Sequence, residues 1–127
     1  MERFVWICLA GALGTGTRYL VGLWAAQRFG PGFPYGTLIV NIAGCFLIAV
    51  VMQLAVQIAT FPPSLRMALT TGFMGGLTTY STFAYETTQL ARDGARGNAL
   101  ANFGITTTAC FVAVLLGFAT ARLFARA

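Results

Sequence analysis

Long uncharged stretches alternate with short breaks that contain proline, glycine or charged residues along the whole chain. In the first stretch, from Phe4 to about Ala26, Arg18 is the only charge. About 23 residues at roughly 1.5 Å per residue extend about 34 Å, which is enough to cross a hydrocarbon core of about 30 Å. The pattern therefore predicts a membrane-spanning helix over residues 4–26.

Three more stretches follow the same pattern. The second lies between prolines, with Pro34 before it and Pro62 after it, and proline ends or kinks a helix. The fourth carries no charge until Arg122. We predict helices over about 36–59, 64–90 and 98–123. Together with the first helix they predict an all-α membrane protein, with one domain over residues 1–127 and four transmembrane helices.

Composition supports a multi-pass protein of the cell (inner or plasma) membrane. Apolar residues make up 57% of the chain and charged residues 9%, against about 25% charged in a soluble domain. The chain has no histidine and no lysine, which leaves no material for a His-based triad, a P-loop lysine or a His/Cys zinc site. The three cysteines, Cys8, Cys45 and Cys110, lie in different predicted helices, so we expect them to pack as small apolar residues. We do not expect an enzyme.

The arginines are divided almost evenly between the two ends of the predicted bundle. With four crossings, both termini lie on one side. That side holds Arg3, Arg66, Arg122 and Arg126, and the other holds Arg28, Arg92 and Arg96. The positive-inside rule then favours neither orientation, so the chain is expected to insert both ways, unless one C-terminal arginine decides the matter. Arginines placed singly at helix ends do not form a nucleic-acid-binding patch.

Two polar residues in the predicted spans are candidates for a functional site. Arg18 lies inside the first helix, where arginine costs about 2.5 to 3.5 kcal/mol on insertion scales. It either reaches the headgroups, pairs with Glu86, or adds positive potential to a water-filled vestibule for anions. Asn41 belongs to the same half of the bilayer and either lines that cavity with Arg18 or joins two helices by a hydrogen bond.

The third predicted helix contains the strongest signal. Glycines at Gly72, Gly75 and Gly76 precede five consecutive hydroxyl-bearing residues over 78–82, and both features weaken a helix. We therefore predict a break near residues 75–80, which at membrane depth must line a cavity or be buried in protein. The alternative is a straight helix whose glycines form a small-xxx-small contact. Hydroxyls and aromatic ring edges without an acidic group favour an anion at the break.

Three motifs resemble the Fluc (CrcB) family of fluoride channels over the full chain. They are Gly14-Thr15-Gly16-Thr17-Arg18-Tyr19, Gly36-Thr37-Leu38-Ile39-Val40-Asn41 and the segment from Thr71 to Phe83. The resemblance implies an antiparallel, dual-topology homodimer with two fluoride pores at the subunit boundaries and a structural sodium ion on the two-fold axis. It also implies passive, fluoride-selective export that confers fluoride resistance.

The resemblance also implies a role for individual residues. The fluoride pore would be lined by Asn41, Tyr80, Phe83, Ser81, Thr82 and Thr106. The vestibule would contain Arg18 and Thr37, and the sodium ion would bind the backbone carbonyls of Gly75 and Thr78. Two positions depart from the family: Tyr80 stands where phenylalanine is frequent, and Cys110 stands where a second hydroxyl is expected.

Two other functions fit the size and charge balance. A small dual-topology multidrug/proton antiporter needs a membrane-buried carboxylate, and Glu86 is the only candidate for it. A scaffold protein with glycine-packed helices would explain the glycines but not the hydroxyl run with two aromatic residues. Fluoride-selective, uncoupled efflux distinguishes the channel from both.

Overall fold

The computed structural model describes residues 1–124, which form helices joined by short connections. This confirms the all-α prediction. The elements are α1 (Glu2–Phe29), α2 (Tyr35–Gln57), α3 (Pro63–Met67), η1 (Ala68–Met74), α4 (Gly75–Leu77), α5 (Tyr80–Arg92) and α6 (Arg96–Phe124).

Three helices, α1, α2 and α6, are each long and apolar enough to cross a membrane. The chain is therefore a multi-pass membrane protein. α1 extends beyond the predicted range of 4–26 because Glu2 lies in its first turn and Arg28 in its last turn, where the helix dipole favours these charges. α6 likewise begins at Arg96, before the predicted 98–123.

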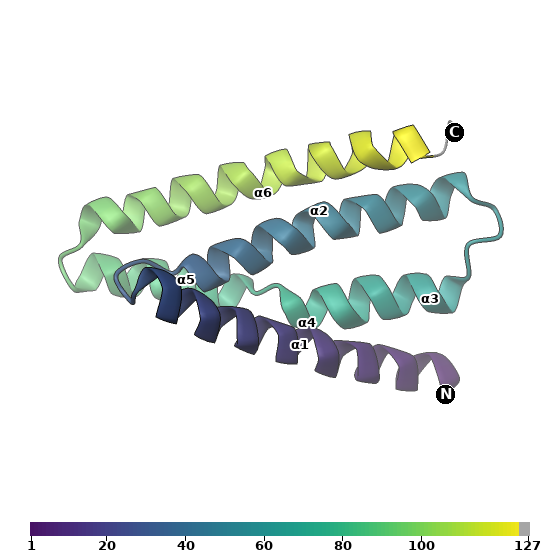
Figure 1. Ribbon diagram of the computed structural model, residues 1–127, viewed down its shortest axis with the longest axis horizontal. Coiled ribbons are helices and arrows are strands. Elements are labelled where there is room, and N and C mark those ends of the chain that lie inside the picture. The colour runs from purple at the N-terminus through teal and green to yellow at the C-terminus, as the bar shows by residue number, and fades with distance from the viewer. Residues whose placement is uncertain (125–127) are drawn as a thin grey trace.

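The segment from α3 to α5 runs the full length of the molecule (Figure 1), with α3, η1 and α4 against α1 and α5 against α6. The chain thus passes four times from end to end, and the start of α1 and the end of α6 lie at the same end (Figure 1). The segment is interrupted once. Thr78 and Thr79 are extended, with φ/ψ of −88°/156° and −154°/114°, so α4 ends and α5 begins inside the stretch 75–80.

The widened turn η1 was not predicted from the sequence. Residues 68–74 form a π-helical stretch between α3 and α4, with α-helical backbone angles at both flanking residues. α3, η1 and α4 are therefore one continuous helix with a wide middle. A π-helical turn accommodates an extra residue and occurs frequently at functional sites.

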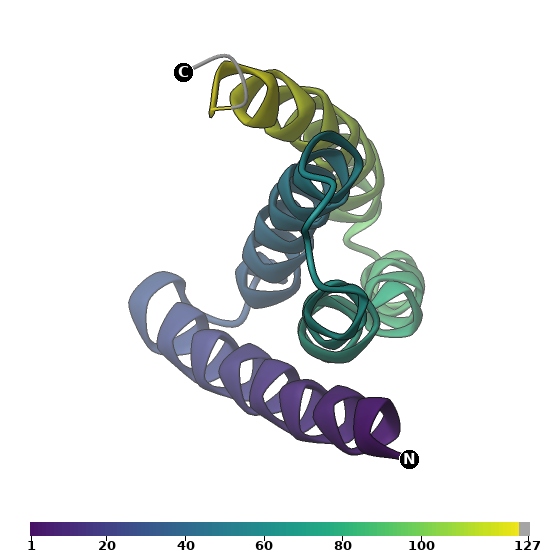
Figure 2. The same cartoon turned by 90° about the vertical axis from the view of Figure 1, so that its right-hand side faces the viewer.

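α2 lies between α1 and α6, and α5 packs against α6 (Figure 2). Glycines bring α1 against the helix before the break. A Cβ on Gly14 would overlap the carbonyl of Phe73, and one on Gly72 would lie 2.8 Å from the carbonyl oxygen of Ile7. The glycine contact and the break, which the sequence offers as alternatives, are thus both present.

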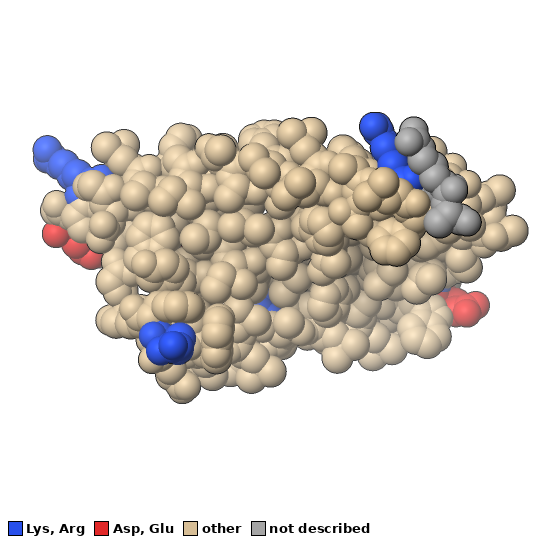
Figure 3. All heavy atoms as spheres, turned by 45° about the horizontal axis from the view of Figure 1, so that its top comes forward, with Lys and Arg blue, Asp and Glu red and all other residues tan. Residues whose placement is uncertain are grey.

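Charged side chains gather at the two ends of the face seen in Figure 3, with one small basic area near its middle. This distribution fits a bundle whose long sides face lipid. Arg126, one of the four arginines assigned to the side that holds the termini, lies outside the described residues. The number of arginines at each end is therefore counted from the sequence.

Candidate functional site

Asn41 joins α2 to the interrupted helix. Its Oδ1 accepts a hydrogen bond from the Thr79 backbone N–H at 2.8 Å, and its Nδ2 donates to the Thr79 carbonyl at 3.2 Å. The buried amide therefore replaces two backbone bonds that the break removes. Nδ2 carries two hydrogens, and among residues 1–124 only one of them has an acceptor. One N–H remains for a ligand.

Thr79 also caps the N-terminus of α5. Its Oγ1 accepts a bond from the Thr82 backbone N–H at 3.1 Å and donates to the Thr82 hydroxyl at 3.0 Å. The Ser81 hydroxyl lies 3.2 Å from the same oxygen. The predicted hydroxyl run thus starts a helix, whose N-terminus carries a partial positive charge that favours anions.

A cavity of about 290 Å³, here called the central cavity, lies between α2, α6 and the start of α5. Four predicted pore residues line it, namely Asn41, Tyr80, Phe83 and Thr106. The sequence reasoning had not placed the other lining residues in the pore, and these are Cys45, Thr78, Thr79, Thr107, Cys110 and Phe111.

The predicted pore residues differ in burial. Asn41, Phe83 and Thr106 are buried, whereas Tyr80 is 78% exposed, although its ring centroid lies 5.7 Å from that of Phe83. Ser81 is exposed and Thr82 half-buried, and neither lines the central cavity. The site therefore has a buried wall and an exposed edge.

A chain of hydrogen bonds behind the central cavity was missed in the sequence. The Thr106 hydroxyl donates to Asn102 Oδ1 at 3.1 Å, Asn102 Nδ2 donates to the Thr87 hydroxyl at 2.8 Å, and that hydroxyl donates to the Phe83 carbonyl at 2.7 Å. Asn102 is 1% exposed. An asparagine four residues before Thr106 in an apolar helix was the available signal.

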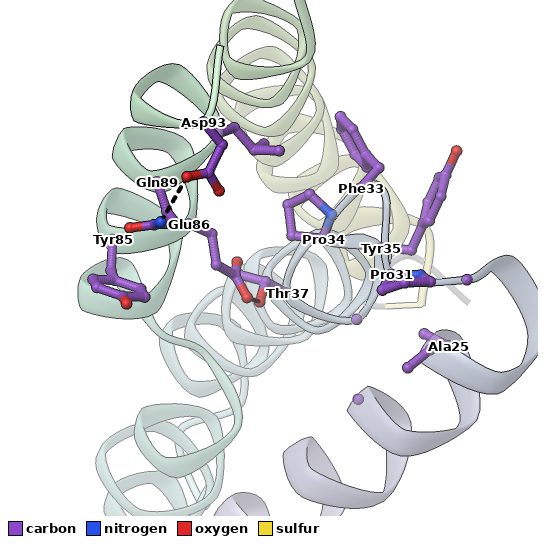
Figure 4. A pocket seen from close by; sticks show the side chains of 15 residues that line it. Ala25, Pro31, Phe33, Pro34, Tyr35, Thr37, Tyr85, Glu86, Gln89 and Asp93 are labelled. Carbon is purple, nitrogen blue, oxygen red and sulfur yellow. Dashed lines mark hydrogen bonds between the residues drawn. The ribbon is translucent and has the colours of Figure 1, made fainter. Parts of the chain in front are cut away.

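The second cavity, here called the end cavity, has about 360 Å³ and lies between the ends of α1 and α5 and the start of α2 (Figure 4). Thr37 donates a hydrogen bond to Glu86 Oε1 at 3.0 Å, and the buried Glu86 Oε2 has no partner among the described residues. Thr37, Asn41 and Cys45 follow at helical spacing along one face of α2. The two cavities therefore succeed one another along α2.

Arg18 belongs to α1, reaches the helix before the break, and lines neither cavity. Its Nε donates to the Gly76 carbonyl at 3.0 Å, and the side chain is half-buried. A cation at the C-terminal end of a helix satisfies carbonyls that have lost their own donors. The structure thus pairs Arg18 with a backbone carbonyl, whereas Glu86 bonds to Thr37.

The carbonyls at the end of α4 are unequally satisfied. The Met74 carbonyl accepts bonds from both the backbone N–H and the hydroxyl of Thr78, each at 2.9 Å. For the carbonyls of Gly75 and Thr78, the described residues supply no such donor. Two unpartnered carbonyl oxygens suit a hard cation, which prefers oxygen ligands.

Known sequences resemble the chain over nearly its whole length. Residues 5–118 match the family described as CrcB-like protein, Camphor Resistance (CrcB). A protein of Citrifermentans bemidjiense named fluoride-specific ion channel FluC is 48% identical over 122 residues, covering 96% of this chain and 98% of the relative. Proteins of the same name from Anaeromyxobacter sp. (strain K) and Sorangium cellulosum are 49% identical over 113 residues and 47% identical over 122 residues. They cover 89% and 96% of this chain, and 90% and 96% of their own lengths. The expected resemblance is confirmed, and the chain belongs to the CrcB family.

Proposed function

We propose that this protein is a passive, fluoride-selective channel that exports fluoride from the cell and is not an enzyme. The observation that carries the proposal is the central cavity at the helix break, which is lined by both the half-satisfied amide of Asn41 and the buried ring of Phe83. The names of the relatives support the same ion.

The conduction path follows one face of α2. An ion enters the end cavity beside Thr37 and passes to the central cavity at Asn41, one helical turn further. On the opposite wall, α5 presents Glu86 to the first cavity and Phe83 to the second. Two successive compartments suit conduction, because an ion held by several weak sites can leave again.

The donors along this path are individually weak. Asn41 offers one amide N–H, the start of α5 offers its partial positive charge, and the aromatic rings offer positive edges. The Ser81 and Thr82 hydroxyls lie beside the cavity at the same helix start. Such donors replace the water shell of a small, strongly hydrated anion without binding it tightly.

Passive conduction is sufficient for resistance. Hydrogen fluoride is a weak acid that crosses membranes as a neutral molecule and dissociates in a less acidic cytoplasm. A channel then lets the trapped anion leave down its electrochemical gradient, without ATP or proton coupling.

An antiparallel homodimer completes the site in this proposal. Thr71, Gly75 and Ser81 are exposed on the interrupted segment, and polar backbone and hydroxyl groups are unfavourable in lipid. A second copy covers this exposed edge, and the near-equal arginine tally allows that copy to insert in the opposite orientation.

A sodium ion belongs to the same proposal. The carbonyls of Gly75 and Thr78 would hold it, since neither has a donor among the described residues. When bound, the ion supplies positive charge that stabilises the broken helix ends where two copies meet.

Electrode-monitored efflux from proteoliposomes tests the channel. We expect rapid, uncoupled loss of fluoride with retention of chloride. Asn41→Asp replaces the donating amide with a negative carboxylate, and Phe83→Ile removes the ring edge, so each should reduce fluoride efflux by about 100-fold, equivalent to about 2.7 kcal/mol. Matched controls are Asn98→Asp and Phe4→Ile, whose side chains are exposed outside the cavity. Unchanged efflux in both cavity variants would refute this pore.

The antiporter gains no support from the comparisons, because the relatives are named as channels. Its one candidate carboxylate, Glu86, accepts a bond from Thr37 at the end of the bundle. Fluoride efflux that required a proton gradient would favour the antiporter over the channel.

Orientation is tested separately. Gln57→Cys, in a chain whose native cysteines are replaced by alanine, puts one thiol at the exposed end of α2. In a dual-topology dimer, an impermeant thiol reagent should label about half of the copies from each side of the membrane. Labelling from one side alone would rule out the antiparallel arrangement.

A further inference from the structure

Two cysteines on different helices line the central cavity. Cys45 comes from α2 and Cys110 from α6, and both are half-buried and line that cavity. Cys45 stands one turn after Asn41 on α2 and Cys110 one turn after Thr106 on α6, and all four residues line the central cavity. The third cysteine, Cys8, is exposed on α1 and does not line the cavity.

The helix packing fixes the positions of this pair. α2 and α6 run in the same direction and pack along their lengths (Figure 1). Gly117 allows a close approach, because a Cβ there would press on the carbonyl of Phe46, the neighbour of Cys45. Helices held by backbone contact cannot separate easily, so both cysteine side chains stay on the wall of the same cavity.

The ligand set selects a class of metal ion. No cluster of three or more His, Cys, Asp or Glu side chains occurs in residues 1–124, so a four-ligand zinc site cannot form there. Two thiolates alone suit soft cations that accept two ligands, such as Cu⁺, Ag⁺ or Hg²⁺. We propose that Cys45 and Cys110 form a two-thiolate site for a soft, two-coordinate cation in the wall of the central cavity.

Metal binding at the two thiols requires no oxidant or reductant. Each S–H bond breaks, both protons leave to solvent, and two metal–sulfur bonds form while the oxidation state of the metal is unchanged. If the proposed conduction path is right, the bound ion occupies the space beside Asn41 and Phe83 and blocks fluoride. This consequence rests on the proposed function, whereas the binding itself does not.

Binding is tested with Hg²⁺ on purified protein that carries Cys8→Ala, which removes the thiol outside the cavity. We expect about one mercury ion per chain, release of about two protons, and ultraviolet absorption typical of mercury bound to thiolate. Adding Cys45→Ala or Cys110→Ala should weaken binding about 100-fold or more in competition with a monothiol. If either variant kept the parent's affinity and proton count, the two-thiolate site would be wrong.

A second measurement places the site relative to the path. In the presence of excess monothiol, Hg²⁺ should stop fluoride efflux from Cys8→Ala proteoliposomes, and a dithiol should restore it. Under the same conditions, each single-thiol variant should keep the efflux rate that it shows without mercury. Tight mercury binding with undiminished efflux would overturn the assignment to the conduction path. Loss of efflux without any metal would instead count against the proposed function, since the binding measurement does not depend on transport.

Discussion

The interrupted segment is held differently on the two sides of its break. Before the break, η1 and α4 lie against α1 with glycine at the contacts, and backbone touches backbone. After the break, α5 is tied to α2 and α6 by side-chain hydrogen bonds through Asn41, Asn102 and Thr87. The first contact leaves no space, whereas the second encloses a cavity.

This difference suggests that the contacts before the break stabilise the fold, whereas those after it also shape the ion path. Close glycine packing in a membrane gains van der Waals contact and fixes helix positions but offers no group to an ion. Hydrogen bonds between side chains keep the helix backbones further apart than glycine contacts do. They therefore leave space for a cavity and orient donors toward it. Damage before the break should therefore reduce stability, whereas damage after it should reduce efflux as well.

Gly14→Ala is expected to have the largest effect on stability. The new Cβ would overlap the carbonyl of Phe73, which is backbone and cannot rotate away. Overpacking of this kind costs about 3 kcal/mol in the free energy of unfolding. Thermal unfolding in detergent measures the loss. A variant as stable as the parent would show that α1 is not held by backbone contact.

Asn102→Ala comes next. The change removes the partner of both Thr106 and Thr87, and leaving buried hydroxyls unpaired costs about 1 to 3 kcal/mol. Because Thr87 also bonds the Phe83 carbonyl, fluoride efflux should fall several-fold at a temperature where the variant remains folded. Asn98→Ala serves as the control, because Asn98 is exposed on the same helix and its side chain makes only a 3.4 Å bond to the Gly32 carbonyl. Equal efflux from both variants would exclude a positioning role.

Thr79→Ala should cost about 1 kcal/mol in the free energy of unfolding, since it removes the N-cap of α5 but keeps both backbone bonds to Asn41. Efflux should fall modestly because the Thr82 hydroxyl loses its partner. Thr88→Ala removes an exposed hydroxyl from the same helix and should leave efflux unchanged. Efflux below that of Asn102→Ala would show that the cap contributes more than the buried network.

Gly16→Ala is expected to have the smallest effect. A Cβ at this position meets nothing within 4 Å, although it lies only two residues from Gly14. The free energy of unfolding should stay within about 0.5 kcal/mol of the parent, or rise slightly because alanine favours a helix. A loss as large as that of Gly14→Ala would show that helix propensity, rather than the Phe73 contact, governs this region.

The sequence predicted features that depend on local patterns. Uncharged stretches predicted the helices, and the glycines followed by hydroxyl-bearing residues predicted the break, which the structure has at Thr78 and Thr79. The partner of Arg18 was not predictable, because a backbone carbonyl such as that of Gly76 carries no mark in the sequence. The hydrogen bond between Asn102 and Thr87 joins two helices, so it could be predicted only if the packing of those helices were known.

The π-helical turn could not be predicted from the sequence for another reason. Widening a helix by one residue over 68–74 leaves its hydrophobic composition unchanged, so no pattern of apolar positions reports it. Its effect is on how the residues before and after it are aligned. Successive residues of an α-helix are offset by about 100°, and a wide turn that holds one extra residue absorbs that offset, so the helix after it keeps its orientation.

Thr79 bonds to Asn41 directly after this stretch. Shortening the chain by a single residue within 68–74 would let the helix close into ordinary turns and leave the break facing α2, whereas one further residue inserted there would turn the break by about 100°. The anion site would then survive a deletion and be lost through an insertion, although neither change touches any of its members.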